Sequence, residues 1–290
     1  MSLSWFEQRC GDAEVAEDAE ARTEEVLWKV SGVSLSSDDS DGECGEAGSV
    51  VGQAGSLLIS ATSNSEVERA VNVEFAGQEL VVSMLMEEHE IAPVFDGAAW
   101  AGTLLWDAAV LAIQYMEETV GAEALRGARV LELGCGSGIP GMCCRLLGAG
   151  SVVLTEQAEL VRLLRQNLAS NAAALDLGDG GTIVAEELLW GEAAAAECGT
   201  THGPFDFVVC CDCVYEPLYG QSWQPLADTL KVLCGRQGSL GLVSLERRDQ
   251  DGVDRFLARL REHGLREEVV HRKGPEDRVG EVLVYRITGC

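Results

Sequence analysis

A glycine-rich turn joins an apolar segment to a predicted helix over residues 130–141, which read VLELGCGSGIPG. Gly134, Gly136 and Gly138 lack a Cβ atom, so the backbone there can adopt positive φ and lie close to a ligand. Pro140 suits the first turn of a helix, where its missing N–H removes no hydrogen bond. A strand that ends in such a turn at a helix N-terminus is typical of nucleotide-type binding sites.

Two cofactor classes bind to this layout, and the spacing of the glycines distinguishes them. The order E-L-G-C-G-S-G resembles motif I of the seven-strand S-adenosylmethionine (AdoMet) methyltransferases. A dinucleotide fingerprint G-x-G-x-x-G also fits, at Gly136, Gly138 and Gly141. That register leaves Gly134 without a role and places Pro140 inside the fingerprint. The turn therefore favours AdoMet, with an NAD-dependent dehydrogenase as the alternative.

Length and charge limit the folds and partners to consider. The 290 residues suffice for one α/β domain with an extension, and are too few for two large domains. The formal net charge is -27 and the sequence contains no basic run, which argues against a nucleic acid partner. Such a chain would attract a basic protein through electrostatic steering, although the same charge can serve solubility alone. We expect a monomer.

The cysteines and the apolar segments indicate the compartment. Eleven cysteines, and an N-terminus without the basic and apolar regions of a signal peptide, predict reduced thiols in the cytosol or the nucleus. Cys210 and Cys213 form a C-x-x-C inside an apolar run, which favours buried thiols over a metal or redox site. Residues 98–116 are almost long enough to span a bilayer. Asp107 near their middle and the acidic flanks favour a buried helix and no membrane partner.

The chain divides into an acidic extension at residues 1–65 and a main domain at residues 66–290. Residues 36–49 are dense in Ser, Asp, Glu and Gly, which predicts a mobile loop. Apolar residues alternate with polar ones over residues 71–75, and a second apolar segment follows at residues 80–85. This pattern predicts a β-hairpin at the start of the main domain.

Apolar strand segments alternate with helical patterns from residue 129 to the C-terminus. The alternation predicts a doubly wound, Rossmann-like α/β sheet of seven strands with right-handed crossovers. The last two strands are close enough in sequence to pair antiparallel. The predicted strands span residues 130–133, 152–155, 183–185, 205–211, 239–245, 266–271 and 281–287, and the predicted helices span residues 104–116, 140–147, 156–171, 223–233 and 252–262, while residues 192–203 are ambiguous.

Two carboxylates follow predicted strands at the edge of the sheet where a ligand is expected. Glu156 ends the second strand, about twenty residues beyond the glycine turn, where a carboxylate can accept ribose hydroxyl protons from NAD or AdoMet alike. Capping the next helix is its alternative role. Asp212 follows the buried strand at residues 205–211, and with Tyr215 it forms the pattern D-x-x-Y. A carboxylate that leaves a buried strand at this point indicates a functional site.

Together these motifs resemble methyltransferase family 16, the "methyltransferase-like 21" group of seven-strand protein-lysine methyltransferases. The similarity extends from about residue 71 to the C-terminus, and D-x-x-Y together with the segment around Trp106 makes it more specific than motif I alone. The matching segments are GTLLWDAA at residues 102–109, ELGCGSGIPG at 132–141, LTE at 154–156, LWG at 189–191, DCVYEP at 212–217 and LERR at 245–248.

The resemblance implies AdoMet as cofactor and a lysine-bearing protein as substrate. It implies that Trp106 packs on the methionine end of AdoMet and that Trp190 flanks the adenine, although both tryptophans would also suit an apolar core. Glu156 would hold the ribose, where the family more often has Asp. The glycine loop would consist of Gly134, Cys135 and Gly136, and Cys211 would line the cofactor pocket by its backbone. Asp212 and Tyr215 would be the catalytic residues that orient the substrate amine.

The expected chemistry suits these residue types. Methyl transfer from a sulfonium is an in-line displacement, so catalysis is chiefly alignment. A lysine ammonium, with a reference pKa of about 10.4, must first lose a proton. Asp212 can aim the ammonium, and Tyr215, Tyr219 and Trp223 could offer cation–π faces to a methylated product. A non-catalytic AdoMet-binding module remains an alternative, as do histidine, arginine and small-molecule acceptors.

Overall fold

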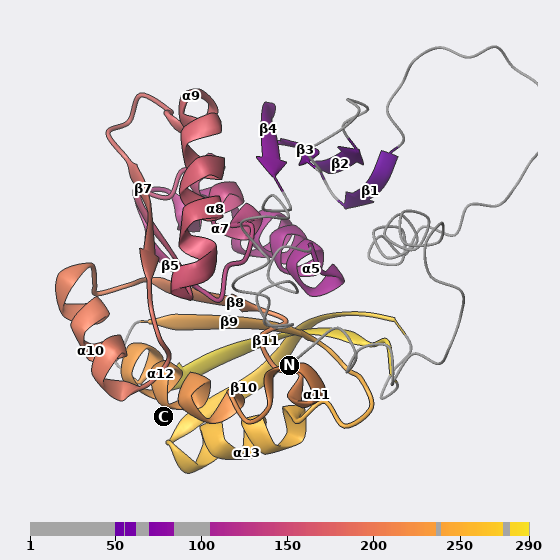
Figure 1. The fold of residues 1–290 in the computed structure, drawn as a ribbon, viewed down its shortest axis with the longest axis vertical. Coiled ribbons are helices and arrows are strands. Elements are labelled where there is room, and N and C mark those ends of the chain that lie inside the picture. Colours follow the sequence, from indigo (N-terminus) through magenta and orange to yellow (C-terminus); the bar gives the residue numbers. More distant parts are fainter. Residues whose placement is uncertain are drawn as a thin grey trace, which may run out of the picture.

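The computed structural model describes residues 50–54, 56–61, 70–83, 105–235, 239–274 and 279–289. They form a seven-stranded sheet with helices on both faces and a separate four-stranded sheet (Figure 1). The predicted mobile loop at residues 36–49 and the predicted boundary at residue 65 lie outside the described residues.

The large sheet has the strand order β10-β11-β9-β8-β5-β6-β7. Adjacent strands from β9 to β7 are parallel, whereas β11 pairs antiparallel with both β9 and β10. The predicted doubly wound α/β fold is therefore confirmed, including its antiparallel final pair. The strands are β5 (Arg129–Leu133), β6 (Ser151–Glu156), β7 (Thr182–Glu187), β8 (Phe207–Cys211), β9 (Leu240–Glu246), β10 (Leu265–Lys273) and β11 (Val282–Gly289).

Helices cover the two faces of this sheet in two layers (Figure 1). Side chains alternate along each strand, so Val130 joins one buried cluster and Leu131 joins the other. One layer contains α5 (Asp107–Tyr115), α7 (Ile139–Leu146) and α8 (Ala158–Ser170), and the other contains α10 (Glu192–Thr201), α12 (Trp223–Cys234) and α13 (Val253–Glu262). The ambiguous segment at residues 192–203 is thus mostly helical. Short turns complete the fold, namely the π-helix η1 (Met116–Val120), α6 (Gly121–Leu125), α9 (Ala172–Leu175) and α11 (Glu216–Tyr219).

The predicted membrane-like apolar segment begins outside the described residues and continues into α5. None of the helices that the structure describes combines the length and apolarity needed to cross a bilayer. Six of the nine residues of α5 are buried, as the sequence predicts for this segment.

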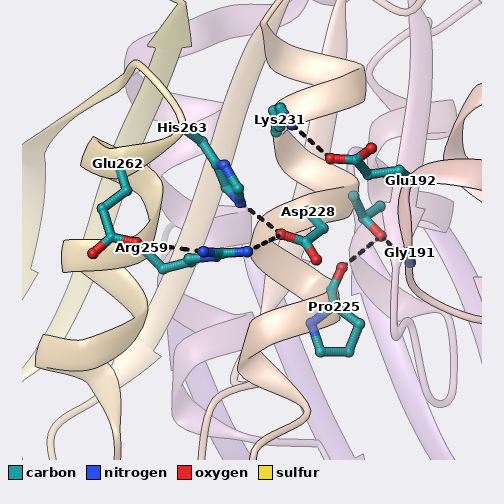
Figure 2. Close-up of polar contacts among 9 residues, drawn as sticks. Gly191, Glu192, Pro225, Asp228, Lys231, Arg259, Glu262 and His263 are labelled. Atoms are coloured by element: carbon teal, nitrogen blue, oxygen red, sulfur yellow. Dashed lines mark hydrogen bonds and ion pairs between the residues drawn. The ribbon is translucent and has the colours of Figure 1, made fainter.

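Polar contacts of α12 tie the second helical layer together (Figure 2). Asp228 Oδ1 accepts a hydrogen bond from Arg259 at 3.2 Å and lies 2.6 Å from His263 Nε2, so α12 is joined to α13. Burial raises the pKa of Asp228, but these hydrogen bonds outweigh it and hold the pKa below its usual value. Thr229 Oγ1 accepts a 2.7 Å bond from the N–H of Gly191. The helix thereby anchors the backbone immediately after Trp190.

The small sheet contains the predicted hairpin and two more strands. β3 (Ala70–Phe75) and β4 (Gln78–Ser83) pair antiparallel, and β2 (Leu57–Ala61) and β1 (Val50–Ala54) extend them on one side. On the other side, two asparagine side chains of α8 bond to the free edge of β4. Asn171 accepts from the N–H of Val81 and donates to its C=O, both at 2.8 Å, and Asn167 bonds to Ser83 in the same way. The two amides replace the next strand of the sheet.

Replacing Asn171 with alanine should lower the free energy of unfolding by about 1–3 kcal/mol, because the N–H and the C=O of Val81 both lose this partner at a partly buried contact. Urea denaturation measures the change. Gln224→Ala removes an exposed amide that bonds only to the nearby Gln221 among the described residues, and should change stability by less than about 0.5 kcal/mol. Equal effects of the two substitutions would contradict a special role for the asparagine contact.

Candidate active site

A cavity of about 290 Å³ opens at the carboxyl ends of β5, β6 and β8. The order of the sheet reverses between β5 and β8, which is where ligands bind in open α/β sheets. The cavity brings together residues that are more than one hundred positions apart in the sequence. All seven residues that the sequence assigned to cofactor binding line it, namely Trp106, Gly134, Cys135, Gly136, Glu156, Trp190 and Cys211.

The glycine loop begins directly after β5 ends at Leu133, as the AdoMet register requires. Gly134 has φ +59, and a Cβ atom there would lie 2.6 Å from Cys213 Sγ and 3.0 Å from the Trp190 ring. Only glycine therefore fits this position without displacing two other residues that line the cavity. Helix α7 then starts at Ile139, one residue earlier than predicted, with Pro140 in its first turn.

Glu156 is buried at the end of β6 and faces the glycine loop. Its Oε2 accepts a 3.0 Å hydrogen bond from the N–H of Gly136, and Oε1 accepts one from the N–H of Gln157 at 2.9 Å. Burial raises the pKa of Glu156, and the two backbone bonds act in the opposite direction. The N-cap of α8 is Gln157, and the described residues include no side-chain cap for that helix, so the capping alternative for Glu156 is not found. Each carboxylate oxygen retains a lone pair that can accept a ribose hydroxyl.

Trp106 lies just before the first residue of α5 and lines the cavity. The helix begins at Asp107, whereas the apolar spacing placed its start at residue 104. Trp106 has an extended backbone (φ -89, ψ 150), and its C=O accepts from the N–H of Ala109 at 2.9 Å. The apolar residues before Trp106 continue the helical periodicity, so the pattern alone does not reveal this N-cap.

Asp212 turns the chain sharply after β8 and lies in the cavity wall. Its φ of +54 is unusual outside glycine, and its N–H donates to the C=O of Ser244 at 2.7 Å. The carboxylate is buried and accepts two hydrogen bonds from Arg248, at 3.0 and 2.6 Å. It also accepts a 3.2 Å bond from the N–H of Glu246. Asp212, which the sequence predicted to orient the substrate amine, is thus paired with Arg248 of the same chain.

The aromatic residues that follow Asp212 lie in different environments. Tyr219 lines the cavity, whereas Tyr215 is not among its lining residues and has its ring 5.2 Å from the guanidinium carbon of Arg248. Trp223 is buried, and its Nε1 donates to Glu216 at 3.3 Å. Of the three rings suggested for a methylated product, Tyr219 alone lines the cavity.

Comparison with known proteins shows which family the chain belongs to. The model of a family described as lysine methyltransferase matches residues 87–263, which is more than half of the chain. The chain belongs to the lysine methyltransferase family. S-adenosylmethionine is accordingly its methyl donor, and the residues present fit that cofactor, since Gly134 leaves room that a Cβ would fill and Glu156 offers a buried carboxylate.

The relatives of this methyltransferase include named lysine methyltransferases. The chain is 30% identical over 183 residues to protein N-lysine methyltransferase METTL21A of Danio rerio, covering 63% of this chain and 75% of that protein. It is 30% identical over 184 residues to EEF1A lysine methyltransferase 3 of Xenopus tropicalis, covering 63% and 73%. Over 128 residues it is 49% identical to secreted RxLR effector protein 48 of Plasmopara viticola, covering 42% of this chain and 65% of that protein.

The fold also matches a solved methyltransferase structure. SMU.776, crystallised with S-adenosylhomocysteine, superposes with a TM-score of 0.50 at 12% identity, covering 78% of this chain and 58% of that chain. At this identity the likeness concerns the fold alone.

Several residues of the methyltransferase site were not predicted from the sequence. Glu132 and Cys213 line the cavity, and so does Leu189, whose side chain is largely exposed. Arg248 was noted as part of a matching segment and received no role. Its position two residues after β9 was the available signal, because parallel strands bring their carboxyl ends to one edge of the sheet.

Glu132 should make the stability of the methyltransferase depend on pH. Burial raises its pKa to about 8, with the nearby Glu156 adding to the rise and a 2.8 Å bond from the N–H of Gly141 opposing it. The folded form keeps this proton between about pH 4.5 and pH 8 whereas the unfolded form loses it, so stability falls as pH rises through that window. The loss amounts to a few kcal/mol, about 1.4 for each unit of pKa shift.

Glu132→Gln keeps the hydrogen bond to Gly141 and removes the titration. The difference in thermal midpoint between this variant and the wild type should therefore increase in the variant's favour from pH 5 to pH 8, and then become constant. Ligand-free protein is the sample for this measurement. A difference that stays the same from pH 5 to pH 9 would show that Glu132 ionises normally.

Proposed function

We propose that this chain transfers methyl groups from AdoMet to lysine side chains of a protein substrate, with Asp212 as the residue that orients the amine. The observation that carries the proposal is the placement of Asp212 in the wall of the same cavity as the glycine loop and Glu156. The segment after β8 lies against that loop, since Cys213 Sγ is 3.6 Å from the C=O of Gly134. A methyl donor and an amine bound on these two sides would meet.

In the proposed mechanism, bound AdoMet supplies a methyl group on a positively charged sulfur. Glu156 would accept the ribose hydroxyls, and Trp106 and Trp190, which line the same cavity, would hold the two ends of the cofactor. Asp212 binds the ammonium of the incoming lysine and directs its nitrogen toward the methyl carbon. The ammonium gives up one proton to water before attack, because only the neutral amine has the lone pair. Alignment supplies most of the rate in this scheme.

The charge of the chain supports a basic protein as substrate. A net charge of -27 increases the rate of encounter with a positively charged partner. The relatives named for EEF1A and for protein N-lysine methylation support a protein acceptor over a small molecule. We place the enzyme in the cytosol or nucleus as a monomer, a location supported by the eight free cysteines among the described residues.

Incubation with methyl-labelled AdoMet and a cell extract tests the proposal directly. We expect label on a basic protein, and peptide mapping should locate it on lysine. Label on histidine or arginine would support methyltransferase activity but would show that lysine is not the acceptor. Binding of S-adenosylhomocysteine in calorimetry without any label transfer would instead favour a non-catalytic binding module.

A further inference from the structure

Arg248 occupies a cation site formed by Asp212, Trp106 and Tyr215. Its guanidinium makes two hydrogen bonds to the Asp212 carboxylate and lies 5.2 Å from the centres of both aromatic rings. A carboxylate combined with two aromatic faces is a general arrangement for binding an organic cation. We call these three residues the acceptor cation site.

The acceptor cation site separates two cavities. Asp212 and Trp106 line the cofactor cavity, whereas Arg248 lines a neighbouring open cavity of about 680 Å³ between the segment after β9 and strands β10 and β11. The Asp212–Arg248 ion pair therefore joins the wall of the cofactor cavity to the wall of the second cavity. Because Asp212 is almost completely buried, its charge needs a cationic partner before the substrate binds.

The surroundings favour exchange of one cation for another. Burial raises the pKa of Asp107 to about 6, which Lys273 opposes and the nearby Glu246 and Asp212 carboxylates increase. This concentration of carboxylates keeps the region attractive to cations. Glu246 also bonds to Arg248 and is itself partly exposed, so Arg248 can leave Asp212 and keep one partner.

We propose that Arg248 holds the place of the substrate lysine, and that the lysine ammonium displaces it from Asp212 during binding. The incoming lysine approaches through the neighbouring cavity and exchanges one positive charge for another at the buried carboxylate. Arg248 then remains paired with Glu246. This inference rests on the proposed role of Asp212 and adds a specificity device to it, because only a ligand that can replace a guanidinium on Asp212 gains access to the methyl group.

Removal of Arg248 should strengthen binding of a small lysine analogue. When a binding site is occupied by an internal group for most of the time, the apparent affinity falls by the free fraction, so occupancy of about 90% weakens binding about tenfold. We therefore expect Arg248→Gln, saturated with S-adenosylhomocysteine, to bind Nα-acetyl-lysine-N-methylamide at least fivefold tighter than the wild type in an NMR titration. Arg248→Lys keeps a cation at the site and should stay within about twofold of the wild type.

Arg261→Gln is the matched control for the change in net charge. Arg261 pairs with Glu267 rather than with Asp212 and lines neither cavity, so its removal should leave probe affinity within about twofold of the wild type. Asp212→Asn combined with Arg248→Gln should lose the gain, because the carboxylate that binds the ammonium is gone. Unchanged or weaker probe binding in Arg248→Gln, or equal tightening in Arg261→Gln, would overturn the inference. Calorimetry with S-adenosylhomocysteine verifies that each variant is folded.

The outcomes separate this inference from the proposed function. If the wild type transfers no label to any protein, the proposed function fails whatever the probe does. If transfer occurs and requires Asp212, but Arg248→Gln does not tighten probe binding, Arg248 is a fixed structural partner of Asp212 and only the displacement is wrong.

Discussion

Asp212→Asn should lower the turnover of methyl transfer by about 100-fold or more, while the affinity for S-adenosylhomocysteine changes by less than about threefold. Asparagine keeps the size of the side chain but removes the charge that we propose to hold the substrate ammonium. A small misplacement of the reacting nitrogen is enough for a loss of this size, because the reaction depends on alignment. Single-turnover transfer of labelled methyl groups and calorimetry measure the two quantities.

Asp176→Asn is the matched control for the loss of a carboxylate. Asp176 is exposed, lines neither cavity and accepts a hydrogen bond from the N–H of Gly178 at 2.9 Å, so the substitution should leave turnover within about twofold. Asp212→Asn also leaves Arg248 without its main partner, and a lower thermal midpoint is expected alongside the loss of turnover. Turnover close to that of the wild type in Asp212→Asn would remove this residue from the proposed mechanism.

Gly134→Ala should weaken binding of S-adenosylhomocysteine by about 30-fold or more. The new methyl group would lie 2.6 Å from Cys213 Sγ and 3.0 Å from the Trp190 ring, so both must move out of the cavity wall. The backbone conformation at φ +59 adds a cost of about 1–2 kcal/mol for any residue with a Cβ. Isothermal titration calorimetry of the purified variant measures the affinity.

Gly127→Ala separates these two causes. Gly127 also has positive φ (+73), but an added Cβ there meets no atom within 4 Å. Gly127→Ala should therefore lose a modest amount of stability, because its positive φ disfavours a residue with a Cβ. Its affinity for S-adenosylhomocysteine should not change. Equal affinities in Gly134→Ala and the wild type would mean that the loop does not contact the cofactor.

Local patterns account for most of the secondary structure. Strand segments such as residues 130–133 and 205–211 were predictable because a parallel strand covered on both faces is a short, continuous apolar run. Element ends were less predictable, as α5 illustrates. Its start depends on the backbone of Trp106, and the apolar residues before Trp106 carry no signal that the helix has not yet begun.

Much of the cofactor cavity was also predictable. The rule that ligands bind at the carboxyl ends of parallel strands places Gly134, Glu156 and Asp212 at one site from the sequence alone. The same rule would have included Arg248, which follows β9 at the same edge. It could not say which of these groups pair with one another.

The amino-acid sequence alone established a doubly wound sheet, an AdoMet-type glycine loop and two carboxylates at its edge, because each depends on residues that are close together along the chain. Only the tertiary structure decided that Asp212 is bound to Arg248 and that two asparagines of α8 complete the edge of β4. Asp212 and Arg248 are 36 positions apart in the sequence, and Asn167 is 84 positions from Ser83. Nothing local selects one partner among the 21 lysines and arginines, since that choice is made by the packing that brings the strands together.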